Sequence, residues 1–260
     1  MSTASIQSRL PDGAVLLRPL WSRTAIPLWL VSLLLLALLA SVRYYAVFGP
    51  PQARILFPLH CLLMWALPWL FLTSHGRREF GLRKPRIIFS SVAFSAIAGA
   101  ACGIAVFALG FVLFGNSPDN WCVSIRDSFQ IDQLRTHMSK AALFAVIVLP
   151  AMILTPIGEE ILFRGFIQQA FLRRWNIFAA VYGNGLAFGL IHLHVHGLWR
   201  DAAGFHFHLV SGVLMVLALS AVSSVFTACR IRTGSLYSAM VAHAACNLAL
   251  LSAVFARYVH

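Results

Sequence analysis

The sequence predicts an all-α fold, a polytopic bundle of about seven or eight transmembrane helices. Hydrophobic residues make up 60% of the 260 residues and charged residues only 11%, whereas an ordinary soluble domain has about 45–50% apolar and roughly 25% charged residues. Long apolar runs are separated by short connections that contain most of the arginines. This is the pattern of helices that cross a bilayer between membrane-flanking loops, and it excludes a soluble domain.

Seven apolar segments are each near the ~20 residues that a helix needs to cross hydrocarbon. They cover roughly residues 26–48, 55–74, 87–114, 140–172, 176–194, 206–229 and 235–257. The third and fourth segments are longer than the hydrocarbon requires, so they must tilt, break or bury an extra turn. A polar tail over residues 1–24 precedes them, and we expect residues 25–258 to form one domain because the sequence has no repeat or low-complexity tract.

The first apolar run has an alternative interpretation as a cleaved signal peptide, with the polar tail as its charged n-region. The tail is long for that role. The tripeptide Arg43-Tyr44-Tyr45 resembles an interfacial anchor more than a cleavage site. We therefore expect an uncleaved first span.

The net charge of +12 lies in short clusters between the apolar runs and not in a basic domain, so it indicates a lipid bilayer as a partner and excludes nucleic-acid binding. Seven spans that start from a cytoplasmic N-terminus place every strong basic cluster in the cytoplasm: 9–23, 75–86, 173–174 and 230–232. The loops 115–139 and 195–205 then lie outside. Lysine occurs at only two positions, which favours a GC-rich bacterial genome and hence a bacterial inner membrane.

The cysteines do not indicate a disulfide or a metal site. The five cysteines are scattered and form no CxxC pair: Cys61, Cys102, Cys122, Cys229 and Cys246. The spacing therefore predicts neither a disulfide framework nor a thiolate metal site.

Two adjacent glutamates, Glu159 and Glu160, lie inside the fourth apolar segment of a chain whose only other glutamate is Glu79. A carboxylate in a membrane costs several kcal/mol unless it is partnered, so intramembrane carboxylates are functional candidates. Arg164 follows Glu160 by one helical turn on the same face and supplies a counter-ion. Glu159 points about 100° away around the helix and has no such partner in its own segment. We expect Glu160 to be structural and Glu159 to be available for chemistry, with a buried glutamate–arginine clamp without chemistry as the alternative.

Pro150 and Pro156 are expected to break this segment, with Thr155 as the N-cap of a new helix. Both glutamates would then lie near a helix N-terminus, where the helix dipole favours negative charge.

Two further pairs of polar or aromatic side chains occur at helical i, i+4 spacing in later spans. They are Phe188 with His192, and His243 with Asn247. Taken alone, each pair is compatible with a buried core histidine or with a hydrogen bond between helices. Counted from the cytoplasmic ends at ~1.5 Å per residue, the glutamate and both histidines lie about 14 to 25 Å deep, so three helices can present them to one cavity.

A carboxylate and an imidazole can hold and deprotonate a water molecule, and histidine and asparagine side chains can donate hydrogen bonds to a developing oxyanion. The combination is suited to amide hydrolysis.

These residues resemble the motifs of the CAAX protease and bacteriocin-processing family of intramembrane proteases, which includes the prenyl-protein (Ras-converting) endopeptidase. The family motifs are two glutamates with an arginine four residues after the second, phenylalanine four residues before histidine, and histidine four residues before asparagine. The matching residues, in the family's order, are Glu159, Glu160, Arg164, Phe188, His192, His243 and Asn247. The resemblance covers about residues 140–250, and the first 135 residues match only as generic transmembrane helices.

The resemblance implies an intramembrane endopeptidase that cleaves a membrane-associated protein or peptide, in bacterial protein processing or sorting. In this interpretation Glu159 and His192 activate the attacking water, and His243 with Asn247 binds the oxyanion. The supporting residues are Glu160, Arg164 and Phe188. We expect a metal-free, glutamate-based mechanism because no His-Glu-x-x-His pair is present. Zinc is the alternative, since one glutamate and two histidines could bind it.

Two other functions remain open at this stage. One is a non-catalytic bacteriocin-immunity or membrane scaffold protein, which has no need for an unpaired Glu159. The other is a proton or ion pathway, for which the sequence lacks a continuous polar stripe. Nothing in the sequence specifies an oligomeric state.

Four histidines have no place in the family pattern: His194, His196, His206 and His208. They could form a metal site or line an entrance, but no spacing among them specifies a ligand geometry. We expect interfacial histidines that face water.

Overall fold

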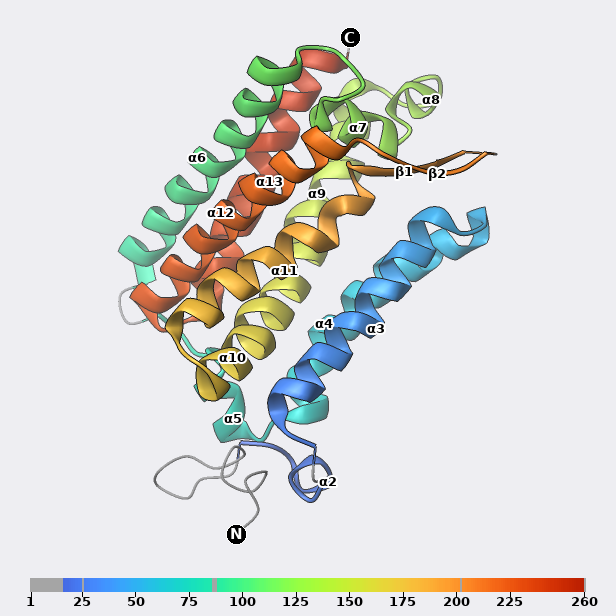
Figure 1. The fold of residues 1–260 in the computed structure, drawn as a ribbon. Coiled ribbons are helices and arrows are strands. Elements are labelled where there is room, and N and C mark those ends of the chain that lie inside the picture. Colours follow the sequence, from blue (N-terminus) through green and yellow to red (C-terminus); the bar gives the residue numbers. More distant parts are fainter. Residues whose placement is uncertain (1–15, 25, 86–87, 202, 260) are drawn as a thin grey trace.

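The computed structural model describes residues 16–24, 26–85, 88–201 and 203–259. Residues 1–15 of the predicted polar tail therefore lie outside the described part. The described chain is an all-helical bundle with one short hairpin, which confirms the predicted polytopic all-α fold (Figure 1). Six of its helical runs are long and apolar enough to cross a membrane: Leu28–Phe48, Pro51–Phe71, Ile88–Phe114, Lys140–Arg174, Leu209–Thr233 and Leu236–Tyr258. The helical stretch over 177–194 lies between the fourth and fifth of these, and a number of seven or eight spans remains a prediction.

The N-terminal half contains mainly α-helices. In chain order these are α2 (Pro19–Ser22), α3 (Leu28–Phe48), the 3-10 turn η1 (Pro51–Ile55), α4 (Leu56–Phe71), α5 (Ser74–Glu79), α6 (Ile88–Phe114), α7 (Trp121–Ser128) and α8 (Ile131–Arg135).

The C-terminal half combines α-helices with two π-helical stretches and a hairpin. Its elements are α9 (Lys140–Glu160), the π-helix η2 (Ile161–Ile167), α10 (Gln168–Arg174), the π-helix η3 (Ala179–Gly183), α11 (Asn184–Ile191), the 3-10 turn η4 (His192–His194), β1 (Leu198–Asp201), β2 (Gly204–Phe207), α12 (Leu209–Thr233) and α13 (Leu236–Tyr258). The two strands pair antiparallel, with Leu198 opposite Phe207.

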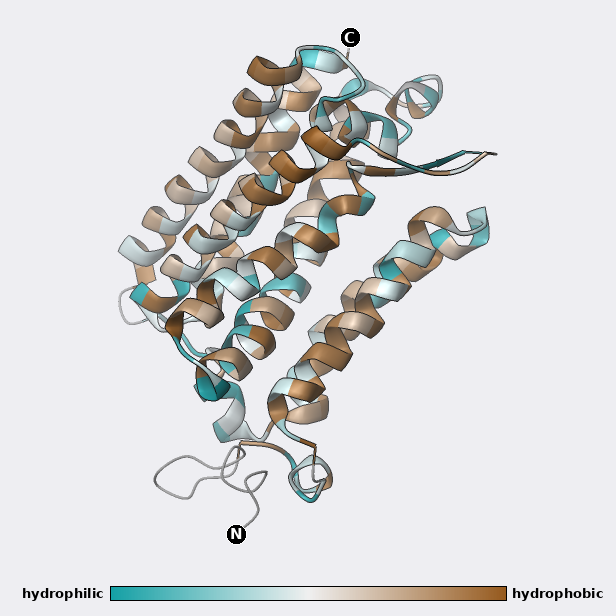
Figure 2. Ribbon diagram, viewed as in Figure 1, coloured by the Kyte–Doolittle hydropathy of each residue, from teal (hydrophilic) through white to brown (hydrophobic). Residues whose placement is uncertain are grey.

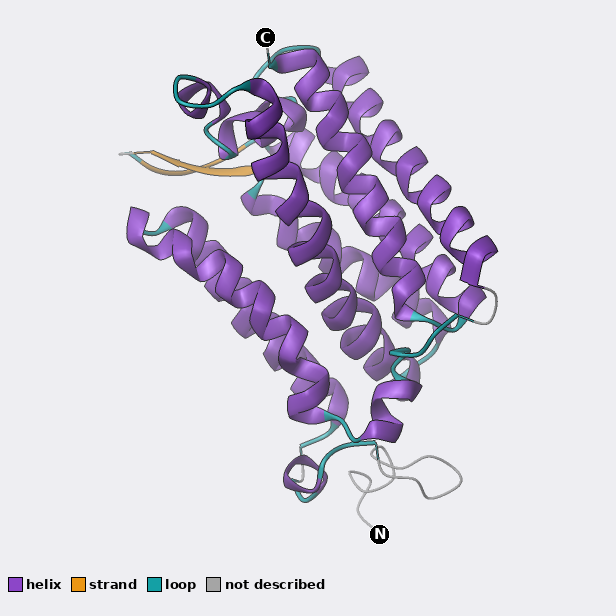
Figure 3. Cartoon of the chain, turned by 180° about the vertical axis from the view of Figure 1, so that it is seen from behind, coloured by secondary structure: helices purple, strands orange, loops and turns teal. Residues whose placement is uncertain are grey.

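Helix α13 lies at the centre of the bundle, where it packs against α6, α9 and α12. Helices α3 and α4 form a pair at one edge; α4 packs against α9 and η2, and α3 packs against η2 and α10 (Figures 1 and 3). Hydrophobic residues run along the length of the helices, as Figure 2 shows. Large apolar side chains such as Phe89 and Val112 are exposed on the outside, as a lipid-facing surface requires.

Close contact between α6 and α13 depends on glycine. A Cβ atom added to Gly99 would lie 1.8 Å from the carbonyl oxygen of Ala242, and one added to Gly103 would lie 2.3 Å from that of Cys246. Small residues of this kind let transmembrane helices approach each other closely.

The two ends of the bundle differ in the elements that cover them. The hairpin with α7 and α8 lies at one end, and α2 with α5 lies at the other (Figures 1 and 3). At the second end Arg83 donates a hydrogen bond to the carbonyl of Gly234 (2.8 Å) and Arg230 donates one to the carbonyl of Phe80 (3.3 Å). The loops 115–139 and 195–205 therefore share one end, and the basic connections 75–86 and 230–234 share the other.

The predicted break at the two prolines is wrong. Pro150 and Pro156 both lie inside the continuous helix α9, and Thr155 is an internal residue whose hydroxyl donates to the carbonyl of Ala151 (3.1 Å). A proline cannot donate to the carbonyl four residues earlier, but neighbouring helices can bond the carbonyls of a loosened turn.

The carbonyls that lose their helical donor to the two prolines are those of Val146 and Met152. Neighbouring helices bond two other carbonyls of α9. The Asn247 amide donates to the carbonyl of Ala151 (2.8 Å), and the Trp65 indole donates to that of Leu154 (3.0 Å). The glutamates consequently lie at the C-terminal end of α9 and not at a helix N-terminus, so the helix dipole does not compensate for their charge.

Candidate active site

Glu159 and Glu160 are followed directly by the π-helix η2, and both side chains are buried, with 1% and 0% exposed. A π-helical stretch changes the direction in which successive side chains point, and such stretches often occur at functional sites. All seven residues of η2 are buried. The two carboxylates therefore lie in the interior of the bundle, where each needs its own counter-ion.

Glu160 has a counter-ion one turn away. Arg164 Nη1 donates to Glu160 Oε1 (2.9 Å), and His243 Nδ1 contacts the same oxygen (2.8 Å). Arg164 also donates from Nη2 to the Ser223 hydroxyl (2.7 Å), and its guanidinium lies 4.7 Å from the centre of the Phe188 ring. This network joins η2 to α11, α12 and α13, so Glu160 and Arg164 hold the helices together.

Glu159 has a counter-ion from a distant helix. Arg43 Nη1, on α3, donates to Glu159 Oε1 at 2.7 Å, and only 3% of Arg43 is exposed. The sequence-based interpretation of Arg43 as an interfacial anchor is wrong, because a buried carboxylate without a local partner is stabilised by the nearest cation that another helix supplies. Arg43 lies inside an apolar run, so the criterion that singled out the glutamates could also have identified it.

The second oxygen of Glu159 faces two histidines. Its Oε2 lies 3.7 Å from His192 Nε2 and 3.9 Å from His243 Nε2. The Nδ1 atoms contact acceptors, the carbonyl of Phe188 for His192 (2.7 Å) and the carboxylate of Glu160 for His243. Assigned from these contacts, each neutral imidazole carries its hydrogen on Nδ1 and presents an Nε2 lone pair to Glu159.

Three acceptor atoms thus converge on one point, and Glu159 Oε2 has no hydrogen-bond partner among the described residues. A cluster of acceptors suits a small molecule that donates hydrogen bonds, such as water.

Access to this cluster is from the side of His192. Its side chain is 16% exposed, whereas those of Glu159 and His243 are 1% and 5% exposed. The ring of Phe188 lies 4.6 Å from that of His192 and also covers Arg164. Phe188 therefore connects the structural ion pair to the partly exposed end of the cluster.

Asn247 lies one turn after His243 on α13. Its amide nitrogen is bonded to the backbone of α9, and no described hydrogen bond joins it to the glutamates or the histidines. A role for Asn247 at an oxyanion remains a prediction.

Two further histidines, which the predicted site omitted, lie around Arg43, His194 in direct contact with it and His60 through the ring of Phe57. His194 (7% exposed) accepts a hydrogen bond from Arg43 Nε (3.3 Å), and His60 (2% exposed) on α4 contacts the carbonyl of Phe57 (2.7 Å). The expectation that His194 faces water is wrong, because α3 covers it. A lone histidine in an apolar run gives no signal that could have distinguished His60 from a core residue.

The other three histidines without a place in the family pattern lie at the hairpin end. His196 is 2% exposed and sits between the hydroxyls of Ser124 and Ser211, so the expectation that it faces water is also wrong. The reason is that α7 and α12 enclose it. His206 and His208 are partly exposed, as expected, and pair with Asp201 (2.9 Å) and Asp119 (2.8 Å).

One carboxylate and two imidazoles are donor types that zinc accepts. Arg43, however, binds the other oxygen of the Glu159 carboxylate, so a metal ion at Oε2 would lie close to a guanidinium in a low-dielectric interior. Within the described ranges, no group of three or more His, Cys, Asp or Glu side chains is placed to hold a metal ion.

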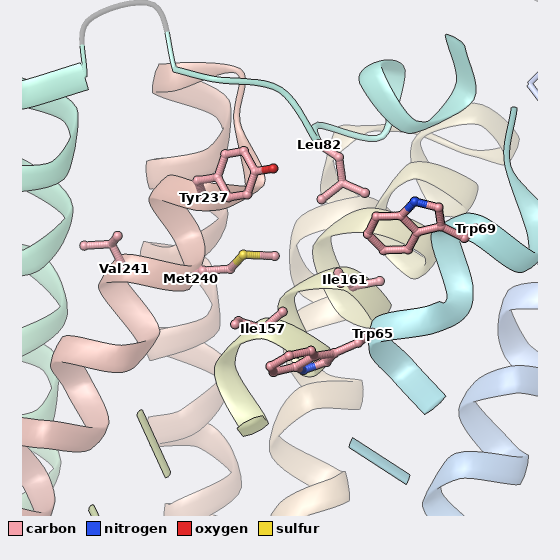
Figure 4. A pocket seen from close by; sticks show the side chains of 8 residues that line it. All are labelled: Trp65, Trp69, Leu82, Ile157, Ile161, Tyr237, Met240 and Val241. Carbon is pink, nitrogen blue, oxygen red and sulfur yellow. The ribbon is translucent and has the colours of Figure 1, made fainter. Parts of the chain in front are cut away.

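An apolar cavity of about 350 Å³ lies between α4 and α13 (Figure 4). Its lining comprises Trp65, Trp69, Leu82, Ile157, Ile161, Tyr237, Met240 and Val241. Two residues of an α-helix correspond to about 200°, so Ile157 and Glu159 point to opposite sides of α9. The cavity is therefore separate from the glutamate–histidine cluster.

Comparison with known proteins identifies one family. Residues 141–249 match the family model described as Rce1-like, type II CAAX prenyl endopeptidase. The match confirms the resemblance, because the segment runs from α9 to α13 and includes all of the motif residues. A comparison with curated proteins and one with solved structures returned no significant match. Helices α3 and α4, with Arg43 and His60, lie outside the matched segment.

Proposed function

We propose, from the premise that residues 141–249 are a CAAX-type protease segment, that this membrane protein hydrolyses a peptide bond of a membrane-associated protein or peptide. One observation supports the proposal above all others, namely the convergence of Glu159 Oε2 with the Nε2 atoms of His192 and His243. A non-catalytic scaffold or immunity protein does not need three acceptors directed at one buried point.

The reaction begins with a water molecule that donates hydrogen bonds to Glu159 and His192. These two groups take up its proton as the oxygen attacks the carbonyl carbon of the substrate. A tetrahedral intermediate forms, and it collapses when the C–N bond breaks and the leaving nitrogen receives the proton.

In the proposed mechanism His243 and Asn247 donate hydrogen bonds to the oxyanion of this intermediate. Because neutral His243 presents its Nε2 lone pair, it can donate to the oxyanion only after it takes up a second proton from solvent before the attack. Glu160 at Nδ1 stabilises that imidazolium, much as a carboxylate orients and stabilises the histidine of a catalytic triad. The amide nitrogen of Asn247 has two N–H donors, so one of them can bond the oxyanion while the other bonds the carbonyl of Ala151.

We propose that the water is activated without a metal ion, because Arg43 already neutralises Glu159. The purified protein should keep its activity after exhaustive chelation and should carry no stoichiometric transition metal. One equivalent of zinc that is lost together with the activity on chelation, and whose return restores the activity, would contradict this.

The function can be tested with the purified full chain in liposomes that also contain single-span peptides of varied sequence. Mass spectrometry of the products then shows which peptides are cleaved. Parent protein should cleave at least one of them and Glu159→Gln none. Equal cleavage by Glu159→Gln would end the protease proposal in favour of a non-catalytic role.

We further propose a bacterial inner-membrane location with a cytoplasmic N-terminus and a site that opens toward the hairpin end, where His192 is partly exposed. Cysteines at Asp201 and Ser74, in a chain without its native cysteines, should label differently with a membrane-impermeant thiol reagent. The Asp201→Cys protein should label in intact cells, and the Ser74→Cys protein only after permeabilisation. The reverse pattern would invert the orientation and favour a cytoplasmic substrate.

A further inference from the structure

Arg43 is a buried cation on a helix that lies outside the matched protease segment. Its guanidinium has three contacts: Nη1 to Glu159 Oε1 (2.7 Å), Nε to His194 Nε2 (3.3 Å), and the ring of Phe57, whose centre lies 5.2 Å away. An anionic, a neutral polar and an aromatic partner thus hold it from three helical segments.

A buried arginine has a large desolvation cost, and α3 has no need of one in order to cross a membrane. Most of α3 is not buried in the bundle. Within an 18-residue apolar stretch of this helix, only 22% of the residues are buried. The direction of Arg43 into the protein therefore calls for an explanation at the group that it contacts, which is Glu159.

The geometry of the carboxylate supplies that explanation. With Oε1 bound to Arg43, the plane of the Glu159 carboxylate is held so that Oε2 faces His192 and His243 at 3.7 and 3.9 Å. His194 and Phe57 in turn hold the guanidinium. Without Arg43 the carboxylate would be free to rotate away from the point on which the acceptors converge.

We propose that Arg43 is a positioning residue of the active site, which supplies the counter-ion of Glu159 and directs its free oxygen toward the two histidines. This inference rests on the proposed function, and it makes α3 part of the active site. Arg43 acts through Glu159 and does not itself touch the substrate.

The first test measures the pairing without reference to activity. Melting temperatures in detergent are compared for the parent, Arg43→Gln, Glu159→Gln and the double variant. Each single change leaves one buried charge without its partner and should lower the melting temperature. The double variant should lose less than the sum of the two single losses. Additive losses would overturn the pairing.

The second test measures peptide cleavage by Arg43→Gln and Arg43→Lys. Arg43→Gln should reduce kcat by about 100-fold with little change in KM, because the carboxylate is misdirected and not absent. Arg43→Lys should recover part of that loss, since lysine restores the charge without the planar fork. The matched control is Arg54→Gln, an exposed arginine on η1 bonded to Gln130 (3.1 Å), which should retain parental activity.

The outcomes separate this inference from the proposed function. Full activity of Arg43→Gln beside an inactive Glu159→Gln overturns the positioning role and leaves the protease proposal standing. Full activity of Glu159→Gln ends the protease proposal, whereas the melting-temperature cycle still reports on the ion pair. A loss in Arg43→Gln confined to KM would also overturn positioning.

Discussion

Helices α13 and α3 both bring a side chain to Glu159, but they are held in the bundle in different ways. Within an 18-residue apolar stretch of each helix, 44% of the residues are buried in α13 and 22% in α3. Helix α13 packs among α6, α9 and α12, whereas α3 lies at the edge. His243 is therefore placed by dense packing on several sides, and Arg43 is placed by a few contacts of which the ion pair is the closest. A side chain of the candidate active site can thus come from a helix that is buried only in part.

The largest expected effect is at Glu159, which side chains from both helices approach. Glu159→Gln should reduce cleavage by about 1,000-fold or more, because it removes the proposed base. It should also lower the melting temperature, since Arg43 would remain buried without its carboxylate. Glu79→Gln, at the end of α5, is the matched control and should cleave normally. Normal melting of Glu159→Gln would show that α3 does not need this ion pair.

The second effect concerns the densely packed region. Arg164→Ala should destabilise the protein by about 3–5 kcal/mol, because it leaves Glu160 as an uncompensated buried charge and removes the bond to Ser223. Denaturant titration in detergent measures the change. Arg174→Ala, on the exposed end of α10, should stay within about 0.5 kcal/mol of the parent. Equal losses in both variants would contradict the structural role of Arg164.

The third effect concerns the packing of α13 itself. Gly99→Val should cost about 1–3 kcal/mol, because its side chain would collide with the carbonyl of Ala242 on α13. Gly165→Ala is the control, since the nearest atom to an added Cβ is a methyl group of Leu236 at 3.5 Å, an ordinary contact. Thermal unfolding of the two variants should differ in this direction. A harmless Gly99→Val would mean that α13 is held less tightly than its burial indicates.

The smallest effect is expected at His196, at the hairpin end. Burial, together with the neighbouring His208, lowers the pKa of His196 to about 4 from its usual value near 6.5. The unfolded chain therefore takes up a proton between pH 6.5 and 4 that the folded chain does not, so stability falls as the pH is lowered through that window. The loss is small near pH 6.5 and grows as the pH falls toward 4.

His196→Gln should remove this acid-dependent component from melting curves recorded across that range. His137→Gln, an exposed histidine near α8, is the matched control and should retain the parental dependence. Retention of the full dependence in His196→Gln would assign the acid sensitivity to another group.

Local spacing and segment length could be interpreted without a structure. The apolar runs predicted the membrane-spanning helices, because about 20 apolar residues have few other stable arrangements. Glu160 with Arg164 was predictable because both partners lie one turn apart on the same helix. The loops 115–139 and 195–205 were predicted on the same side from the alternation of the apolar runs and the basic clusters between them, and the structure places them at one end.

Interactions between distant segments were not predictable in this way. Helix α9 is continuous through Pro150 and Pro156. Side chains from α4 and α13 bond its carbonyls at Leu154 and Ala151. The burial of His194 and His196 depends on neighbours that cover them from α3, α7 and α12. No spacing rule relates residues that are so far apart in the chain.

By itself, then, the sequence determined that this protein crosses a membrane and carries two glutamates, two histidines and an asparagine in a protease-like order. Only the tertiary structure decided that Glu159 is held by Arg43, across 116 residues of chain. The physical reason is that a buried charge must be neutralised by whichever opposite charge the packing brings within reach, and the packing of α3 against the site is a property of the whole bundle.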